Sequence, residues 1–166
     1  MSLLNNCTDL AFKFLSSVEI DNYGSNQHEL HGARAFKNLF GYNKQRLQGT
    51  ITYIDTNNIS SRKTQLTWYD SREFNLNRSE YRFYYTSEIS DFKPNVNDLL
   101  LISHNRLNNQ VVIVIIHDKD IIKKILRNKY QFKEYNYPNG SSYYAEIKNI
   151  PWITNIIWDS VEIYRN

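Results

Sequence analysis

The chain has 166 residues, which suits one domain built around a single core. Hydrophobic residues make up 41% and charged residues 22%, a balance that excludes an intrinsically disordered chain. The net charge of +3 is compatible with a polyanionic partner. The single cysteine, Cys7, excludes an internal disulfide and a cysteine-rich zinc site.

The N-terminal segment lacks the basic start and the unbroken apolar run of a signal peptide, and no apolar run is long enough to cross a bilayer. We therefore expect a soluble protein without a membrane partner. Residues 3–16 fit either a short amphipathic helix or a strand, and a polar loop follows over 18–28. Residues 27–40 carry apolar side chains at helical spacing and stop at Gly41, which predicts a helix.

From residue 49 onward the apolar pattern has a period of two, which predicts strands at 50–54, 64–69 and 78–85. The apolar runs 99–104 and 111–117 flank the polar turn residues 105–109 and predict a hairpin. Asp118 is placed to cap a helix over 119–127. Short strands at 143–147 and 158–164 complete a mainly β (α+β) chain. We expect a β-barrel or pseudobarrel with two or three short helices, in one domain spanning residues 1–166.

Two segments carry side chains suited to reading DNA. The first is the glycine-flanked loop 24–32, where amide and imidazole groups can read base edges in the major groove. Its candidate contact residues are Ser25, Asn26, Gln27 and His28, and Arg34 is placed to meet a phosphate. The spacing of Asn26 and Glu29 also fits a capping box that starts the next helix, so a structural role is an alternative.

The second segment is the strand at 78–85, whose alternation places Arg78, Glu80, Arg82 and Tyr84 on one face. Arginine can pair with guanine and glutamate with cytosine, so this face could enter a groove. A solvated strand face with an ordinary ion pair is the alternative. Basic and aromatic residues just upstream could add to the same surface, namely Lys63, Trp68, Tyr69 and Arg72.

The order of these motifs resembles the N-terminal DNA-recognition (effector-binding) domain of EcoRII-type type II restriction endonucleases. That domain is a DNA-binding pseudobarrel related to plant transcription factors of the auxin-response type. The resemblance covers roughly residues 15–127. It rests on the Gly-Ser-Asn-Gln-His loop at 24–28, the Arg-Ser-Glu-Tyr-Arg-Phe-Tyr-Tyr strand at 78–85, and the Asn-Asp-Leu-Leu-Leu-Ile entry to the hairpin at 97–102.

The resemblance implies a seven-stranded pseudobarrel that grips duplex DNA between two arms entering the major groove. The N-terminal arm would carry Ser25, Asn26, Gln27 and His28. The C-terminal arm would carry Arg78, Glu80 and Arg82, with Trp68, Tyr69 and Arg72 nearby. The family often has a Gly-His-Gln-x-Gly loop that leads into a strand, whereas residues 26–29 here lead into a segment with a helical pattern.

The resemblance further implies sequence-specific binding of double-stranded DNA by a domain that does no chemistry itself. Such a domain would be a fragment of a larger bacterial, cytoplasmic restriction endonuclease, covalently linked to the nuclease domain. Binding would need no cofactor, and magnesium would serve only the parent nuclease. Whether the domain binds a second DNA copy as an effector or simply adds affinity stays open.

The sequence motifs that would indicate other function classes are weaker. A magnesium-dependent nuclease could use Glu146 and Lys148 with Asp118 or Asp120, or Asp91 and Lys93 with Asp70, but short triplets of this kind arise by chance. His28 and His31 are spaced like zinc ligands but have no evident third ligand. No Gly-x-Ser-x-Gly elbow or glycine-rich phosphate loop is present. A protein- or carbohydrate-binding module is the remaining alternative.

Overall fold

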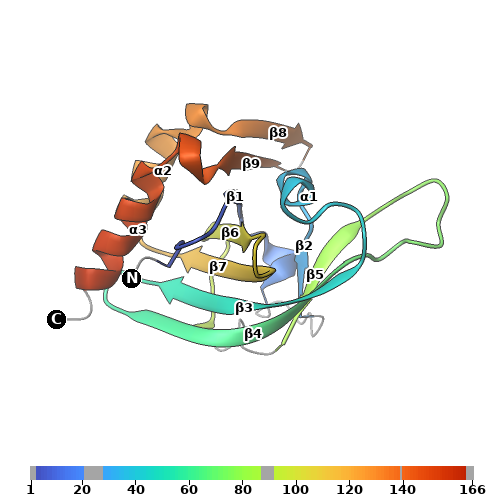
Figure 1. Ribbon diagram of the computed structural model, residues 1–166, viewed down its shortest axis with the longest axis horizontal. Helices are drawn as coiled ribbons and strands as arrows, with labels where there is room; N and C mark the ends of the chain where they lie inside the picture. The colour runs from blue at the N-terminus through green and yellow to red at the C-terminus, as the bar shows by residue number, and fades with distance from the viewer. Residues whose placement is uncertain (1–2, 21–27, 87–91, 139, 164–166) are drawn as a thin grey trace.

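The computed structural model describes residues 3–20, 28–86, 92–138 and 140–163, the last six of these by backbone alone. Its described strands form one nine-stranded sheet in the order β2-β5-β4-β3-β7-β6-β1-β9-β8. The sheet curls strongly but stays open (Figure 1). β3 and β7 run parallel, whereas the other neighbouring strands are antiparallel.

The strands are β1 (Asp9–Phe14), β2 (Glu29–His31), β3 (Gln45–Ile54), β4 (Ile59–Asp70), β5 (Tyr81–Tyr85), β6 (Leu99–Asn105), β7 (Gln110–Ile116), β8 (Lys133–Tyr137) and β9 (Gly140–Glu146). The α-helices are α1 (Arg34–Phe40), α2 (Lys119–Arg127) and α3 (Trp152–Ile163). Short 3-10 turns are η1 (Ser17–Glu19), η4 (Lys129–Gln131) and η5 (Ile147–Asn149). None of the described helices is long and apolar enough to cross a membrane.

Alternate residues of the central strands face two different cores. In β1, Ala11 packs in the first core, whereas Leu10 and Phe12 pack in the second. The first core also contains the apolar face of α1, which lies between the two ends of the curled sheet (Figure 1). The second core lies under α2 and α3, which contribute Ile121 and Ile153 among others.

Several sequence predictions are confirmed. β6 and β7 form the expected hairpin, and their apolar runs are nearly continuous because both faces of these strands are buried. The Asp118 side chain caps α2 by accepting hydrogen bonds from the backbone N–H groups of Asp120 (2.8 Å) and Ile121 (3.1 Å). The ambiguous N-terminal segment contains a strand, β1, which pairs with β6 on one side and β9 on the other.

The helix predicted over 27–40 is wrong in its first half. Residues 29–31 form β2, which pairs with β5, and only residues 34–40 are helical. Leu30 is fully buried in the sheet opposite Phe83, and Glu29 pairs with Arg82 instead of completing a capping box. Tertiary pairing therefore overrides the helical spacing. A strand, not a helix, therefore follows residue 28.

Two other expectations need correction. Residues 158–163 of the strand predicted at 158–164 belong to α3, and residue 164 lies outside the described residues. The sheet has nine described strands and is an open, curled sheet, where seven strands in a pseudobarrel were expected. The β8–β9 hairpin extends the sheet beyond β1, and β8 was not predicted because its residues show no clear apolar alternation.

Gly49 allows the parallel pair β3 and β7 to approach closely. A Cβ atom at this position would lie 2.1 Å from the carbonyl oxygen of Val111, directly across the pair. No side chain fits in that space, so glycine is required at this position of β3.

Candidate nucleic-acid interface

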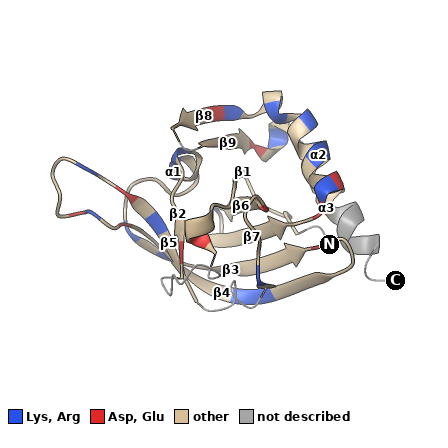
Figure 2. Cartoon of the chain, turned by 180° about the vertical axis from the view of Figure 1, so that it is seen from behind, with Lys and Arg blue, Asp and Glu red and all other residues tan. Residues whose placement is uncertain are grey.

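One side of β3, β4 and β5 forms a polar face. Alternate residues of these strands, such as Leu47, Leu66 and Phe83, are buried in the first core. The residues between them point to the opposite side and are polar from Arg46 to Thr50 of β3 and from Lys63 onward in β4, and Figure 2 shows a basic band on β4. We call the following set the polar face: Arg46, Gln48 and Thr50 of β3, Lys63, Gln65, Thr67 and Tyr69 of β4, and Arg82 and Tyr84 of β5.

The strand register arranges the polar face in rows across the sheet. Gln48 lies between Gln110 of β7 and Gln65 of β4, which makes a row of three amide side chains. A neighbouring row runs from Arg46 through Thr67 to Tyr84 and ends at Glu29 of β2. Directly opposed residues in a sheet lie within side-chain reach of one another, so each row presents a continuous polar surface.

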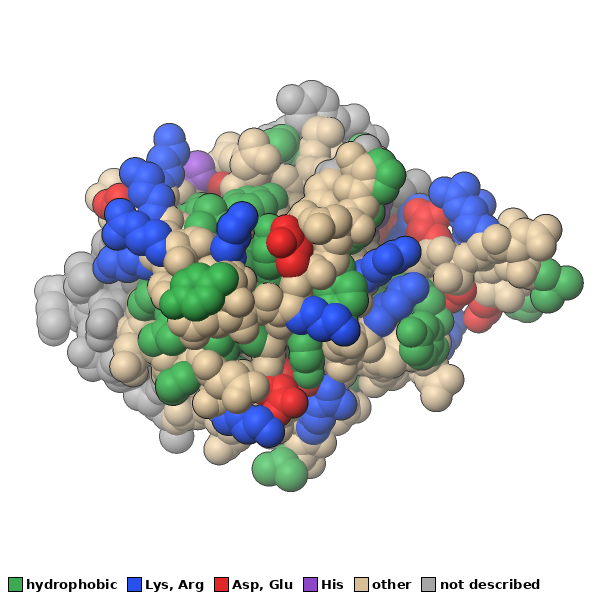
Figure 3. All heavy atoms as spheres, turned by 90° about the horizontal axis from the view of Figure 1, so that it is seen from above, with side chains coloured by type: hydrophobic (Ala, Val, Ile, Leu, Met, Phe, Trp, Pro, Cys, Tyr) green, Lys and Arg blue, Asp and Glu red, His purple; other side chains and the backbone are tan. Residues whose placement is uncertain are grey.

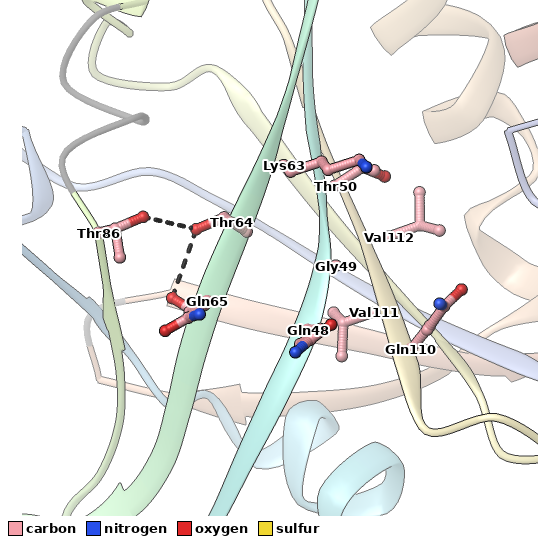
Figure 4. A pocket seen from close by; sticks show the side chains of 10 residues that line it. All are labelled: Gln48, Gly49, Thr50, Lys63, Thr64, Gln65, Thr86, Gln110, Val111 and Val112. Carbon is pink, nitrogen blue, oxygen red and sulfur yellow. Dashed lines mark hydrogen bonds between the residues drawn. The ribbon is translucent and has the colours of Figure 1, made fainter.

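A groove is hollowed into the polar face. Its largest pocket has a volume of about 640 Å³ and is lined by Gln48, Gly49, Thr50, Lys63, Thr64, Gln65, Thr86, Gln110, Val111 and Val112 (Figure 4). A second hollow shares Gln48 and Gln65 with it and continues to Arg46 and Tyr84. A third adds Lys44 and Tyr69. Because the hollows share lining residues, we treat them as one groove that crosses β7, β3, β4 and the end of β5.

The groove offers hydrogen-bonding groups and cations that have few internal partners. Within the described part of the chain, Lys44, Arg46 and Lys63 form no ion pair, and no acidic residue lines the groove. The Thr64 hydroxyl lies 3.1 Å from that of Thr86 at the floor of the pocket. The groove is therefore positively charged and suited to an anionic, hydrogen-bonding partner.

A chain of charged side chains, which we call the charge chain, lies beside the end of the groove nearest β2. The Arg82 guanidinium lies between Glu29 and Glu80, with 2.7 Å from Nη2 to the Glu80 carboxylate, and Arg72 Nε donates to the same carboxylate at 2.7 Å. These hydrogen bonds from Arg72 and Arg82 lower the pKa of Glu80 to about 2. Arg82 is thus held by two carboxylates and is not free to bind another anion.

Tyr69 joins the charge chain by donating its hydroxyl hydrogen to Glu29. Burial, and then the hydrogen bond to the Glu29 carboxylate, raise the pKa of Tyr69 to about 12. Tyr69 therefore stays neutral and fixes one oxygen of Glu29, while Arg82 binds the other.

The link between β4 and β5, residues 71–80, extends away from the rest of the molecule (Figure 1), and we call it the arm. Its root is closed by the Asp70 carboxylate, which accepts from the N–H groups of Arg72 (2.9 Å) and Glu80 (2.7 Å). Along the arm, Asn75 N–H donates to the Arg72 carbonyl at 2.8 Å. Phe74 and Leu76 are 93% and 103% exposed, so the arm presents two uncovered apolar side chains.

The structure places the predicted site residues in different environments. Tyr69, Arg72, Glu80 and Arg82 come together in the charge chain, and Arg78 is exposed on the arm. Trp68 is fully buried in the first core, where its indole N–H donates to the Gly41 carbonyl at 3.0 Å. It supports β4 from beneath and is not on the polar face.

The structure describes only some of the candidate DNA-contacting residues near the N-terminus. Ser25, Asn26 and Gln27 lie outside the described residues. His28 has a φ of 46°, packs its ring edge-on against Tyr85, and has no hydrogen-bond partner for Nδ1 within the described part. Arg34 is exposed at the start of α1 and does not line the groove.

The residues of the alternative function classes are placed as follows. Glu146 and Lys148 form an exposed ion pair of 2.6 Å, Asp118 caps α2, and Asp70 closes the arm. Asp91 lies outside the described residues. Among the residues described, the structure brings together no group of three or more His, Cys, Asp or Glu side chains that could hold a metal ion.

Sequence reasoning missed most of the groove. Arg46, Gln48, Gln65 and Thr67 were not singled out, because the strand containing the first two was expected to start only at residue 50. The polar and apolar residues already alternate from Arg46 onward, and this signal could have revealed the polar side of β3.

No protein-family profile matches this sequence, and a comparison with curated proteins finds no match.

Proposed function

We propose that this protein binds double-stranded DNA sequence-specifically, with the groove and the arm as its contact surface. The observation that carries the proposal is the groove itself. It combines Lys44, Arg46 and Lys63, which have no ion-pair partner among the described residues, with a row of three glutamine side chains. Cations can neutralise phosphates, and glutamine amides can pair with adenine in the major groove.

The arm and the charge chain fit the same proposal. The arm projects from the end of the groove nearest Tyr69 and Tyr84, so a duplex in the groove would lie beside it. Glu80 and Glu29 are held in place by Arg82, and a fixed carboxylate can accept a hydrogen bond from cytosine N4. In this arrangement Arg82 positions the two carboxylates, and base reading falls to the groove amides and Arg46.

We further propose that the chain acts as the recognition part of a type II restriction endonuclease, with magnesium-dependent cleavage in a linked nuclease domain. The support for this narrower role is the resemblance of residues 24–28, 78–85 and 97–102 to the EcoRII-type recognition domain.

The proposal is tested by selecting bound duplexes from a randomised pool without magnesium and then incubating the same pool with magnesium. We expect one short motif to be enriched and no DNA to be cleaved. A Gln48→Ala/Gln65→Ala variant should bind that motif roughly tenfold or more weakly and lose discrimination at one or two base pairs. Retention of the pool without any enriched motif would overturn sequence specificity, and cleavage would assign the chain a nuclease activity.

A control variant separates base reading from a general loss of fold. Thr56→Ala changes an exposed side chain of the turn after β3, away from the groove lining, and should leave the selected motif unchanged. Failure of the wild-type protein to retain any duplex at low salt would overturn DNA binding altogether.

A further inference from the structure

The net positive charge of this chain is concentrated on one short segment. Residues 119–129, which comprise α2 and the start of η4, contain five basic residues and one acidic residue and so carry a net charge of +4. The whole chain carries +3, so the remaining residues together carry −1. The basic residues are Lys119, Lys123, Lys124, Arg127 and Lys129.

The geometry of α2 presents this charge in a line. Lys119, Lys123 and Arg127 are spaced by four residues and therefore lie one above the other along the helix. All five basic residues are exposed, and none forms an ion pair within the described part of the chain. Figure 2 shows basic bands along α2, and Figure 3 shows Lys and Arg side chains gathered at the end of the molecule where this helix lies.

The opposite side of α2 explains why the basic side is accessible. Ile121 and Ile125 are buried in the second core, so packing fixes which face points to solvent. Like charges four residues apart along one line repel one another, and a polyanionic partner would relieve that repulsion.

The spacing of the line suits a phosphate backbone. Residues 119 and 127 are eight positions apart, which is about 12 Å along an α-helix. One strand of a duplex carries a phosphate about every 3.4 Å along its axis, so this length matches three or four phosphates. A membrane surface would also attract lysines, but the apolar face of α2 is already buried and could not insert into lipid.

α2 also lies on the same side of β3 as the groove. Ile54 of β3 packs in the core beneath α2, and Gln48 and Thr50, which have the same parity along the strand, line the groove. Gln48 and Ile54 are six residues apart, which is about 20 Å along a strand. That separation, measured along β3, is comparable with the width of a duplex.

We propose that the basic face of α2 binds the phosphate backbone of duplex DNA without regard to sequence, as a second contact beside the groove. This inference rests on the proposed function for its choice of partner, but it concerns a different surface. It assigns sequence-independent affinity to α2 and sequence reading to the groove.

The test compares a Lys123→Gln/Arg127→Gln variant with a Lys133→Gln/Lys148→Gln control, which removes the same charge from exposed positions outside α2. Binding of a random-sequence duplex is measured by fluorescence anisotropy over a range of salt concentrations. We expect the α2 variant to bind roughly tenfold more weakly and its log–log salt slope to fall by about two units. The control should change neither the affinity nor the salt slope. Circular dichroism establishes that both variants are folded.

The outcomes separate this inference from the proposed function. An α2 variant with wild-type affinity and salt slope would overturn the role of α2, even if the Gln48→Ala/Gln65→Ala variant loses its motif. Loss of affinity in the α2 variant, without any effect of the groove variant, would leave the role of α2 in place and overturn the groove as the reading surface. Binding of the wild type to phosphatidylserine vesicles but not to duplex would overturn the assignment to nucleic acid.

Discussion

The guanidinium of Arg82 pairs with two carboxylates, those of Glu29 and Glu80, and the Arg82 side chain is only 22% exposed. Removing it would leave the partly buried Glu29 without its cation and Glu80 with Arg72 alone. We expect Arg82→Ala to lower the free energy of unfolding by about 2–4 kcal/mol, as measured by urea denaturation. Arg46→Ala is the matched control, because Arg46 is exposed and has no ion-pair partner in the described part; it should change stability by about 0.5 kcal/mol or less. Equal losses of stability in Arg82→Ala and Arg46→Ala would contradict a stabilising role of Arg82 between the two carboxylates.

Glu80 makes the stability of this region depend on pH. Its pKa is lowered from 4.5 to about 2, so its contribution to stability is fully present above about pH 4.5 and is lost as the pH falls through 2. We expect the free energy of unfolding of the wild type to decrease over this range. Glu80→Gln removes the titrating group and should make that decrease smaller, as seen in urea titrations at successive pH values. A variant with an unchanged pH dependence would show that Glu80 is not held by its arginine partners.

At the scale of elements, the arm combines an ordered root with an uncovered apolar tip. Because Phe74 and Leu76 contact little of the protein, Phe74→Ser/Leu76→Ser should change stability by about 0.5 kcal/mol or less. If the arm touches DNA as proposed, the same variant should bind the selected duplex at least about fivefold more weakly in anisotropy titrations. A variant that binds as tightly as the wild type would remove the arm tip from the contact surface.

The parallel pairing of β3 and β7 depends on Gly49. A methyl group there must displace the Val111 carbonyl, which separates the two strands and opens the floor of the groove. We expect Gly49→Ala to lower the free energy of unfolding by about 2–3 kcal/mol. Gln48→Ala changes the adjacent, exposed position and should have little effect on stability. The two variants are compared by their midpoints of thermal denaturation. Equal midpoints would contradict the close approach of β3 and β7 at Gly49.

For the whole molecule, one sheet joins two cores, and β1 contributes side chains to both. We therefore expect the cores to unfold together. Phe12 stacks on Tyr143 and meets Phe132 edge-on in the second core, so Phe12→Ala should cost about 3–5 kcal/mol. Trp68 reports on the first core and Trp152 on the second, and their fluorescence in single-tryptophan variants should change at the same urea concentration. Separate transitions would indicate two independently folding units.

The amino-acid sequence by itself determined the local elements with strong periodic patterns. The β6–β7 hairpin follows from two apolar runs around a polar link, and α2 follows from its cap at Asp118 and its apolar stripe. The alternation of β5 also placed Arg82 and Tyr84 on one face and Phe83 on the other, because side-chain direction along a strand depends only on position. These features can be predicted from the local sequence without reference to residues far away along the chain.

Only the tertiary structure decided which residues form the candidate site. The helical spacing of residues 27–40 did not reveal that Leu30 pairs with Phe83 in a sheet, and Trp68 was expected at the surface although it is buried. The groove depends on the register between β7, β3 and β4, which brings Gln110, Gln48 and Gln65 into one row. That register is set by long-range pairing and by the space that Gly49 leaves open, and neither is encoded in the local period of any one strand.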